Sequence, residues 1–178
     1  MKVIVVSDSH GRNNLLFKLQ EMHPDADAFL HCGDLEDDPR LFPGWVFVRG
    51  NNDYFGDFEN ERIVYLDHGH KIFMTHSHRC TYAYRKDSMY LKGLTNKCDI
   101  VCYGHTHVSE ITHRDGILLL NPGSLWLPRD GNPPSYAILE THGSKVDVKI
   151  LFEPDWFEPE PKRWWEKNYD NILTHEDK

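Results

Sequence analysis

The apolar residues of the chain fall into short runs that end abruptly at polar turns. Residues 3–6 (VIVV) form a continuous β-branched run that stops at Ser7. Comparable runs at residues 28–32, 45–48 and 99–103 each end within two residues of a glycine. Continuous apolar runs of this length are typical of strands that are buried on both faces. The pattern therefore predicts four such strands.

Two segments have helical character. Leu15, Leu16, Leu19 and Met22 recur at helical spacing, so we expect a helix that Asn13 or Asn14 caps and that ends by Pro24. Residues 82–97 form a second predicted helix with a less regular apolar period. Strands that alternate with helices predict an α/β fold with a largely parallel sheet.

The second half of the chain changes character. Residues 63–66 and 71–75 flank the turn at residues 67–70 and predict a hairpin. Four more strand candidates follow, separated by Gly, Pro and Asn turns, at residues 109–113, 117–120, 136–140 and 145–151. Their close spacing predicts antiparallel pairs that form a second sheet. We therefore expect one α/β domain over residues 1–151, with two packed sheets flanked by helices.

Residues 152–178 form a C-terminal extension of different composition, in which three prolines and several acids accompany six large aromatic residues. This extension is too aromatic for a plain solvated tail. We expect it to pack over the domain's own apolar surface, with a subunit contact as the alternative.

Composition narrows the classes of function. The 178 residues include 20 Lys and Arg against 28 Asp and Glu, a formal net charge of −8, which argues against a broad electrostatic grip on nucleic acid. No apolar stretch approaches the roughly 20 residues of a membrane span, and the N-terminal sequence lacks the pattern of a signal peptide. The four cysteines form no CxxC pair. We therefore expect a cytoplasmic protein with reduced thiols and no membrane partner.

Five polar clusters, each after a strand-like run, contain candidate metal ligands. The carboxyl ends of strands in an α/β sheet meet at one crevice, and in an extended Asp-x-His or His-x-His both side chains point to one side. Carboxylate, imidazole and amide ligands suit Mn²⁺, Fe or Zn²⁺. Each cluster alone is a common turn, but the ordered set is not. The clusters are Asp8/His10, Asp34, Asn51/Asp53, His76/His78 and His105/His107.

This order, Asp-x-His, Gly-Asp, Gly-Asn-x-Asp, Thr-His-x-His and Gly-His-x-His, resembles the calcineurin-like metallophosphoesterase superfamily. The chain length and the Asn-Pro-Gly-Ser turn at residues 121–124 resemble its small single-domain bacterial and archaeal phosphodiesterase branch. The resemblance covers residues 1–151 and implies a four-layer α/β/β/α sandwich.

The resemblance also implies a site with two divalent metal ions. Mn²⁺ is the preferred assignment, and Ni²⁺, Fe and Zn²⁺ are alternatives. Asp34 would serve both ions, held about 3.5–4 Å apart, and a hydroxide between them would attack phosphorus in line. One ion would be bound by Asp8, His10, Asp34 and His107, and the other by Asp34, Asn51, His76 and His105.

Three further residues take part in this prediction. We expect Asp53 to accept a hydrogen bond from an imidazole and orient it. His78 has two open roles, contact with the substrate or support of the ligands. His31 is expected to be structural, although it lies close enough to Asp34 in sequence to assist it.

Asn52 departs from the broader family, which usually has at this position a histidine that resembles a general acid. An amide cannot donate a proton as an acid near pH 7, and general acid catalysis supplies about 10²–10⁴-fold. We therefore expect slow hydrolysis of alkyl esters and faster hydrolysis of aryl phosphodiesters. The alternatives are a phosphomonoesterase and a non-catalytic interaction scaffold on the same fold. The expected partners are a small phosphate ester and a second copy of the chain, in a dimer or tetramer.

Overall fold

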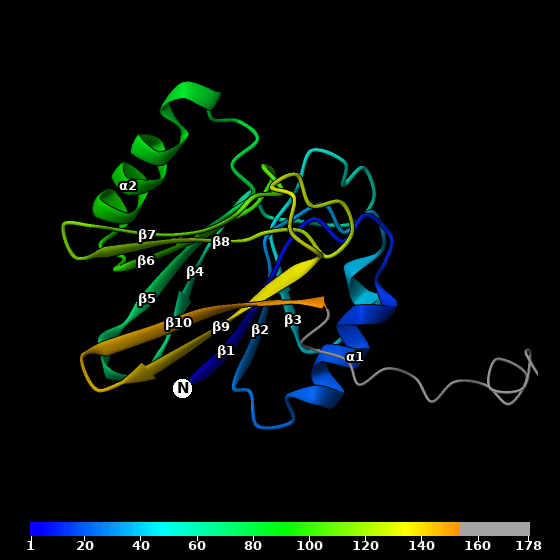
Figure 1. Ribbon diagram of the computed structural model, residues 1–178, viewed down its shortest axis with the longest axis horizontal. Helices are drawn as coiled ribbons and strands as arrows, with labels where there is room; N and C mark the ends of the chain where they lie inside the picture. The colour runs from blue at the N-terminus through cyan, green and yellow to red at the C-terminus, as the bar shows by residue number, and fades with distance from the viewer. Residues whose placement is uncertain (154–178) are drawn as a thin grey trace, which may run out of the picture.

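The structure is a computed structural model, and it describes residues 1–153. The predicted extension lies almost wholly outside the described residues. Two helices are α1 (Asn14–Met22) and α2 (Arg85–Asn96), and short 3₁₀ turns lie at Pro39–Leu41, Asp67–Gly69 and Tyr82–Tyr84 (Figure 1). The strands are β1 (Lys2–Val6), β2 (Ala28–His31), β3 (Trp45–Phe47), β4 (Glu61–Tyr65), β5 (Lys71–Thr75), β6 (Ile100–Tyr103), β7 (Ser109–Arg114), β8 (Ile117–Pro122), β9 (Ser135–His142) and β10 (Lys145–Phe152).

The first sheet has the strand order β10-β9-β1-β2-β3. β1, β2 and β3 are parallel, with Val3 opposite Ala28 and Phe29 opposite Trp45. β9 pairs antiparallel with both β1 and β10. The parallel core agrees with the prediction, but β9 and β10 were expected in the second sheet. They belong to the first because β9 pairs with β1, which is far from it in the sequence, and β10 follows as the hairpin partner of β9.

The second sheet has the order β4-β5-β6-β8-β7. β5, β6 and β8 are parallel, and β4 pairs antiparallel with β5 as the predicted hairpin. β7 joins β8 at the other edge, also antiparallel. The second sheet is therefore mixed, rather than a set of antiparallel pairs alone.

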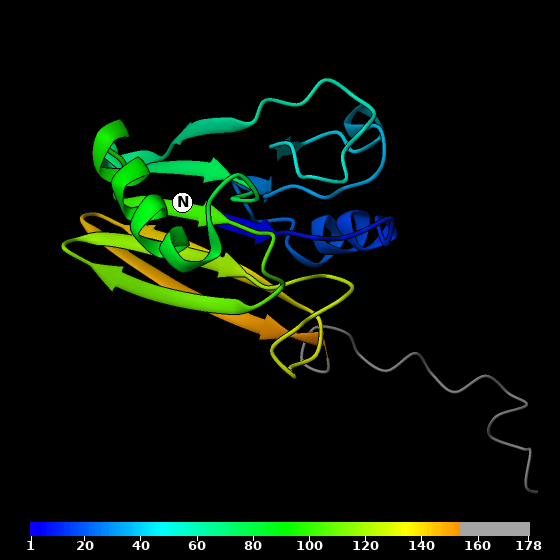
Figure 2. The same ribbon diagram turned by 90° about the horizontal axis from the view of Figure 1, so that it is seen from above.

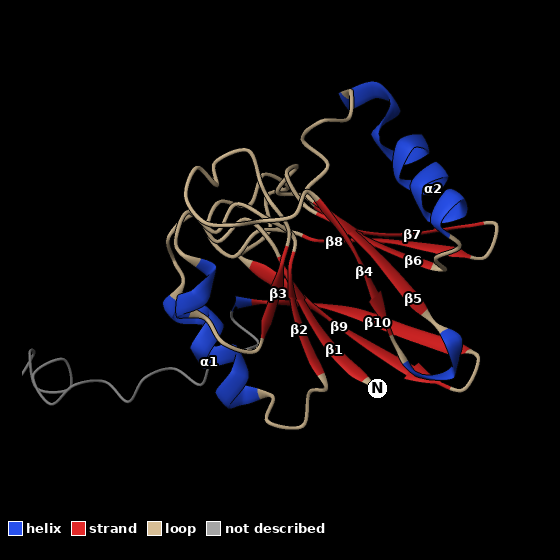
Figure 3. Cartoon of the chain, turned by 180° about the vertical axis from the view of Figure 1, so that it is seen from behind, coloured by secondary structure: helices blue, strands red, loops and turns tan. Residues whose placement is uncertain are grey.

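Three apolar clusters hold the layers together. The central cluster lies between the sheets and contains Val3 and Val5 from one sheet and Ile72 and Met74 from the other. The alternate residues of β1, Ile4 and Val6, face the opposite way and join a cluster with α1. A third cluster packs α2 on the second sheet. Figures 2 and 3 show the resulting order of layers, with α1 and α2 on opposite sides of the two sheets.

Helix α1 begins where the sequence predicts, but its expected cap does not form. Asn13 is the residue before the helix and makes no side-chain capping bond. Its side chain instead accepts a hydrogen bond from the Ser9 hydroxyl (2.7 Å) and donates one to the carbonyl of Leu35 (3.1 Å). Asn13 therefore ties together the loops that follow β1 and β2, at the end of the molecule where the loops gather (Figure 3).

Candidate metal centre

The loops after the strands reach the centre through left-handed backbone turns. Few residues other than glycine adopt a positive φ, and such conformations concentrate at functional sites. We expected the paired ligands to converge because side chains alternate along an extended strand. This reason is wrong, because β1 ends at Val6 and β6 ends at Tyr103, before the paired ligands begin. Five predicted ligands have φ between 44° and 75°: Asp8, His10, Asp34, His105 and His107.

Two glycines allow the loops to approach the carboxylates closely. A Cβ atom at Gly50 would lie 2.0 Å from Asp34 Oδ1, and one at Gly104 would lie 2.8 Å from Asp8 Oδ2. A real Cβ atom cannot occupy either position, so these glycines are required for the shape of the site.

Five of the predicted ligands form two groups whose ligand atoms lie within 4.8 Å of one another. The first group is Asp8, His10 and His107, and the second is Asp8, Asp34 and His76. Asp34 also approaches both groups, because its Oδ2 lies 3.4 Å from His76 Nε2 and 3.7 Å from His10 Nε2. Asp8 Oδ1 lies 3.1 Å from His107 Nε2. All except His10 are nearly or fully buried.

In each of these three imidazoles, Nδ1 is fixed by an oxygen that can only accept hydrogen bonds. Nδ1 must therefore carry the proton, and Nε2 of the neutral ring is left with a lone pair directed at the centre. The acceptors are the Glu36 carboxylate for His10 (2.6 Å), the Leu127 carbonyl for His107 (2.6 Å) and the Cys32 carbonyl for His76 (2.7 Å).

The site consequently brings acceptors face to face. His10 Nε2 and His107 Nε2 are 3.2 Å apart, and His76 Nε2 lies 3.2 Å from Asn51 Oδ1. Asp8 Oδ1 is buried with no hydrogen-bond donor in the part of the chain that the structure describes. Buried acceptors without donors are costly, and a cation among them satisfies all of them at once. The residues present therefore fit divalent metal ions.

Asn52 and Asp53 hold the loop that carries Asp34. Asn52 donates from its backbone N–H to Asp34 Oδ1 (2.8 Å) and from its side-chain amide to Oδ2 (2.9 Å). The Asp53 carboxylate accepts from the backbone N–H groups of Asp34, Glu36 and Gly50, at 2.7–2.9 Å. Within residues 1–153, Asp53 thus orients backbone, and the imidazole partner expected for it is not among its hydrogen bonds.

The remaining predicted residues lie beside the two groups. The backbone N–H of His105 donates to Asp8 Oδ2 (3.0 Å), and the His105 ring lies outside both groups, 5.2 Å from the His76 ring centroid. The His78 ring lies 5.4 Å from that of His76 and 6.2 Å from that of His105. His31 is buried and structural, and accepts from the Gly33 N–H while it bonds to Ser9 Oγ.

Charges in the centre are strongly coupled. Burial opposes ionisation of Asp34, but a protonated His76 and the Asn52 backbone N–H outweigh it and hold the pKa of this carboxyl well below its usual range. Burial likewise opposes ionisation of Asp8, whose pKa is nevertheless lowered by His107 and His76. The two carboxylates outweigh burial at His76 and raise its pKa. The centre therefore keeps two anions in a buried place, which favours positive charge between them.

His105 and His78 behave differently, because burial lowers the pKa of each. The pKa of His105 falls to about 4, and the positive charges of His76 and Arg85 add to the effect of burial. The pKa of His78 falls for the same first reason, with His76 and Arg79 contributing. Both rings are therefore neutral near pH 7 and retain a lone pair.

The sequence reasoning missed two residues. Glu36, which orients His10, is an exposed acid two positions after Asp34, and only this Asp-x-Glu spacing could have indicated it. Ser124 is the last residue of the Asn-Pro-Gly-Ser turn at residues 121–124, which indicated the family but no role in the site. Its hydroxyl donates to the Asp8 carbonyl (2.8 Å) and accepts from the N–H groups of Trp126 and Leu127. The turn thus connects the Asp8 loop with the carbonyl that orients His107.

The chain is similar in sequence and fold to known phosphoesterases. Residues 1–144 match the calcineurin-like phosphoesterase superfamily domain. The probable metallophosphoesterase YsnB of Bacillus subtilis is 34% identical over 154 residues, covering 84% of this chain and 90% of YsnB. The phosphodiesterase MJ0936 of Methanocaldococcus jannaschii is 28% identical over 173 residues, covering 85% of this chain and 99% of its own. The structure of a predicted phosphoesterase from Streptococcus pneumoniae superposes with a TM-score of 0.80 at 29% identity, covering 89% and 93% of the two chains.

The chain therefore belongs to the calcineurin-like phosphoesterase superfamily, a family of metal-dependent hydrolases. The predicted resemblance and the predicted two-sheet sandwich are both confirmed. Within residues 1–153 no helix is long and apolar enough to cross a membrane.

Proposed function

We propose that this protein hydrolyses small phosphate diesters with two divalent metal ions, Mn²⁺ being the preferred pair. The observation that carries the proposal is the set of ligand atoms at one centre, in which Nε2 atoms and carboxylate oxygens face one another without donors. Asp34 would serve both ions, since its Oδ2 lies near His10 on one side and His76 on the other. Relatives named as phosphodiesterases support the choice of diesters.

In this proposal the residues of the chain would hold and orient the divalent ions, which would act as the Lewis acid. Divalent cations bound here would offset charge on a phosphoryl group and supply an acidified water as the nucleophile. Glu36, Leu127 and Cys32 accept hydrogen bonds from Nδ1 of the three imidazoles, so that Nε2 is the nitrogen each neutral ring presents to a metal. Asn52 holds Asp34 in place and offers an amide, not a proton, to the leaving group.

The decisive experiment is metal reconstitution. The full chain is treated with a chelator, loaded singly with Mn²⁺, Ni²⁺, Fe²⁺ or Zn²⁺, and assayed with bis(p-nitrophenyl) phosphate and p-nitrophenyl phosphate. We expect metal-dependent release of nitrophenolate, faster from the diester, and its loss in His107→Gln but not in His113→Gln, an exposed histidine on β7. Faster hydrolysis of the monoester would favour a phosphomonoesterase. Absence of metal-dependent activity on both would leave the scaffold alternative.

The proposal for Asn52 has its own test. Asn52→His should raise the rate of hydrolysis of a dialkyl phosphodiester more than that of bis(p-nitrophenyl) phosphate. The reason is that only a poor leaving group needs a proton. General acid catalysis typically contributes about 10²–10⁴-fold, and we expect the ratio of alkyl to aryl rates to rise by at least about tenfold. An unchanged ratio would contradict the proposed consequence of the amide.

A further inference from the structure

A small cavity adjoins the second group of ligands. Its volume is about 180 Å³. A cavity of about 150 Å³ holds a benzene molecule, so this space admits a group of comparable size. Its walls come from the end of β5 and the loop that follows, from the start of β4 and from α2, through Thr75, Ser77, His78, Arg79, Glu61 and Lys92 among others.

The cavity and the metal centre share a wall. His76, the metal ligand, lies between Thr75 and Ser77, which both line the cavity. His78 lines the cavity from the same loop, and its ring contacts the rings of His76 and His105 at 5.4 and 6.2 Å between centroids. His78 therefore borders both the cavity and the rings of the metal centre.

The charged side chains on the β4 and α2 side of the cavity are paired with each other. Glu61 stands opposite Thr75 in the β4–β5 ladder, and its carboxylate is ion-paired with Lys92 from α2. Lys92 also lies over the ring of Phe73, 5.4 Å from its centroid. These two charges compensate each other, so they fix the wall and leave no net charge for a ligand.

Two polar side chains on the other side of the cavity, in the loop after β5, are not paired. The Arg79 guanidinium is exposed and makes no hydrogen bond or ion pair with residues 1–153. His78, the preceding residue, also lines the cavity, and its Nδ1 is buried with no hydrogen-bond partner in the same part of the chain. An unpaired guanidinium with an unpaired imidazole nitrogen is suited to an anionic oxygen group, because arginine binds carboxylate and phosphate through two parallel hydrogen bonds.

We infer that this cavity is a subsite for a second anionic group, a carboxylate or phosphate, on one arm of the substrate. Arg79 provides the charge and His78 a polar contact at the wall shared with the metal centre. The preferred substrates are then diesters with an acidic arm, rather than neutral dialkyl or diaryl esters. This inference rests on the proposed function, because it places the scissile phosphate at the metals.

The test compares three p-nitrophenyl diesters that share a leaving group and differ in the other arm: butyl, 3-carboxypropyl and 3-phosphooxypropyl. For the metal-loaded protein we expect kcat/KM for at least one acidic arm to exceed that for butyl by about tenfold, the size of one charged hydrogen bond. Arg79→Gln should reduce this ratio to near one, and Arg79→Lys should restore part of it. Arg114→Gln, which removes a cation from the distant β7, should leave the ratio unchanged.

Two results would overturn the subsite: equal kcat/KM for all three esters, or a preference that survives in Arg79→Gln. Preference for only one acidic arm would identify the group as carboxylate or phosphate. If no ester is hydrolysed, the proposed function fails, and calorimetric binding of the same esters decides the subsite. Binding of an acidic ester that is tenfold tighter than that of the butyl ester, and that weakens in Arg79→Gln, would support the subsite. Equal affinity for all three esters would reject the subsite.

Discussion

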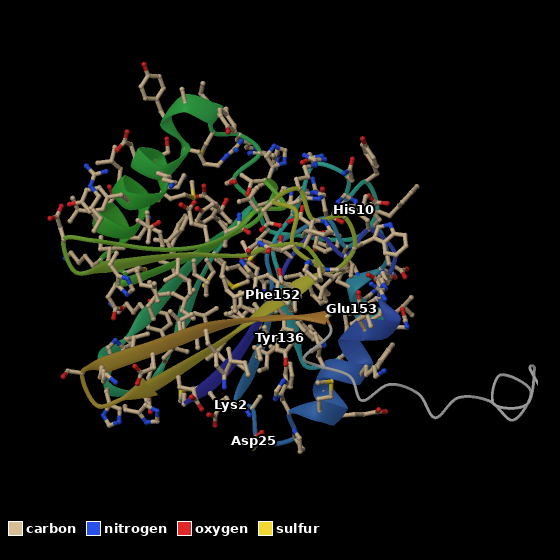
Figure 4. The ribbon with its side chains drawn as sticks, in the orientation of Figure 1. Lys2, His10, Asp25, Tyr136, Phe152 and Glu153 are labelled. Carbon is tan, nitrogen blue, oxygen red and sulfur yellow. The ribbon has the colours of Figure 1, made fainter. Side chains whose placement is uncertain are left out.

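Two clusters of histidine and aspartate lie at opposite ends of the strands, and they solve the problem of buried charge differently. At the amino end of β5, His70 directs Nδ1 to the carboxylate of Asp99 and Nε2 to the carbonyl of Gly143 (2.9 Å). Both ring nitrogens face acceptors, so a proton on each satisfies the cluster. At the other end, where Figure 4 labels His10, the Nε2 atoms of His10 and His107 face each other instead.

The difference separates a structural cluster from a metal site. The His70 cluster obtains its positive charge from a proton, and the hydrogen bond that His70 Nδ1–H donates to Asp99 raises the pKa of His70 despite burial. The His10–His107 pair has its outer nitrogens already committed to Glu36 and Leu127. A single divalent cation bound between its two inner nitrogens satisfies both at once. The orientation of the second ring nitrogen, rather than the residue types, therefore distinguishes the two ends.

The largest effect should come from Asp34, the carboxylate that we propose serves both ions. Asp34→Asn should reduce metal-dependent activity more than about 100-fold, because even loss of a residue that only orients a ligand typically costs about 10–100-fold. Asn51→Ala removes one neutral ligand and should cost less. Rates at saturating metal and metal affinity by calorimetry check both variants. Equal losses would count against a shared role for Asp34.

Glu36 offers a smaller and more specific test. Glu36→Gln keeps an acceptor for His10 Nδ1 but removes its charge, and Glu36→Ala removes both. We expect metal affinity to fall by about 10–100-fold in Glu36→Ala and by less in Glu36→Gln. Glu21→Gln on α1 is the matched control. Unchanged affinity in Glu36→Ala would show that His10 needs no orientation from the carboxylate.

The two clusters should respond oppositely to loss of a carboxylate when metal is withheld. In the presence of a chelator, Asp99→Asn should lower the free energy of unfolding by about 1–3 kcal/mol, because His70 loses a charged partner. Asp8→Asn should not lower it, since the new amide can donate to His107 Nε2, now 3.1 Å from a carboxylate oxygen. Denaturant unfolding of both variants measures the difference. If Asp8→Asn is as destabilising as Asp99→Asn, the metal-free centre is not short of donors.

The smallest effect concerns pH. Because the folded pKa of His70 is raised above 6.5, its stabilisation is complete below pH 6.5 and is lost as the pH rises through the folded value. The stability difference between the native protein and His70→Gln should therefore be larger at pH 5.5 than at pH 8.5, by less than about 1 kcal/mol for a partly exposed pair. Urea unfolding in chelator checks this, with His113→Gln as the control. A difference that grows with pH would reverse the assignment.

Much of the fold could be predicted because a continuous apolar run directly indicates a buried segment. The runs of β1, β2 and β3 are long enough to be read as strands, and their polar ends identify the crevice. The sheet of β9 could not be predicted, because its run shows only that both faces are covered and not which strand lies beside it. The pairing with β1 depends on contacts far apart in the sequence.

The sequence predicted which residues are candidate ligands better than it predicted how the backbone positions them. Spacing marked Asp8, His10 and His107, and the structure brings them together. The left-handed turns that do so were not visible, since aspartate and histidine carry no fixed signature of positive φ. Glu36 and Ser124 were missed because their roles depend on partners in other loops.

The left-handed backbone also limits which metals could be engineered into the site. Asp, Asn and His are the side chains, other than glycine, that accept positive φ most readily, and five ligands rely on this tolerance. Replacement of Asp8 or His107 by cysteine would be penalised by the backbone before any metal binds. His76 and Asn51 do not have positive φ. A redesign toward thiolate-preferring metals should therefore begin at those two positions.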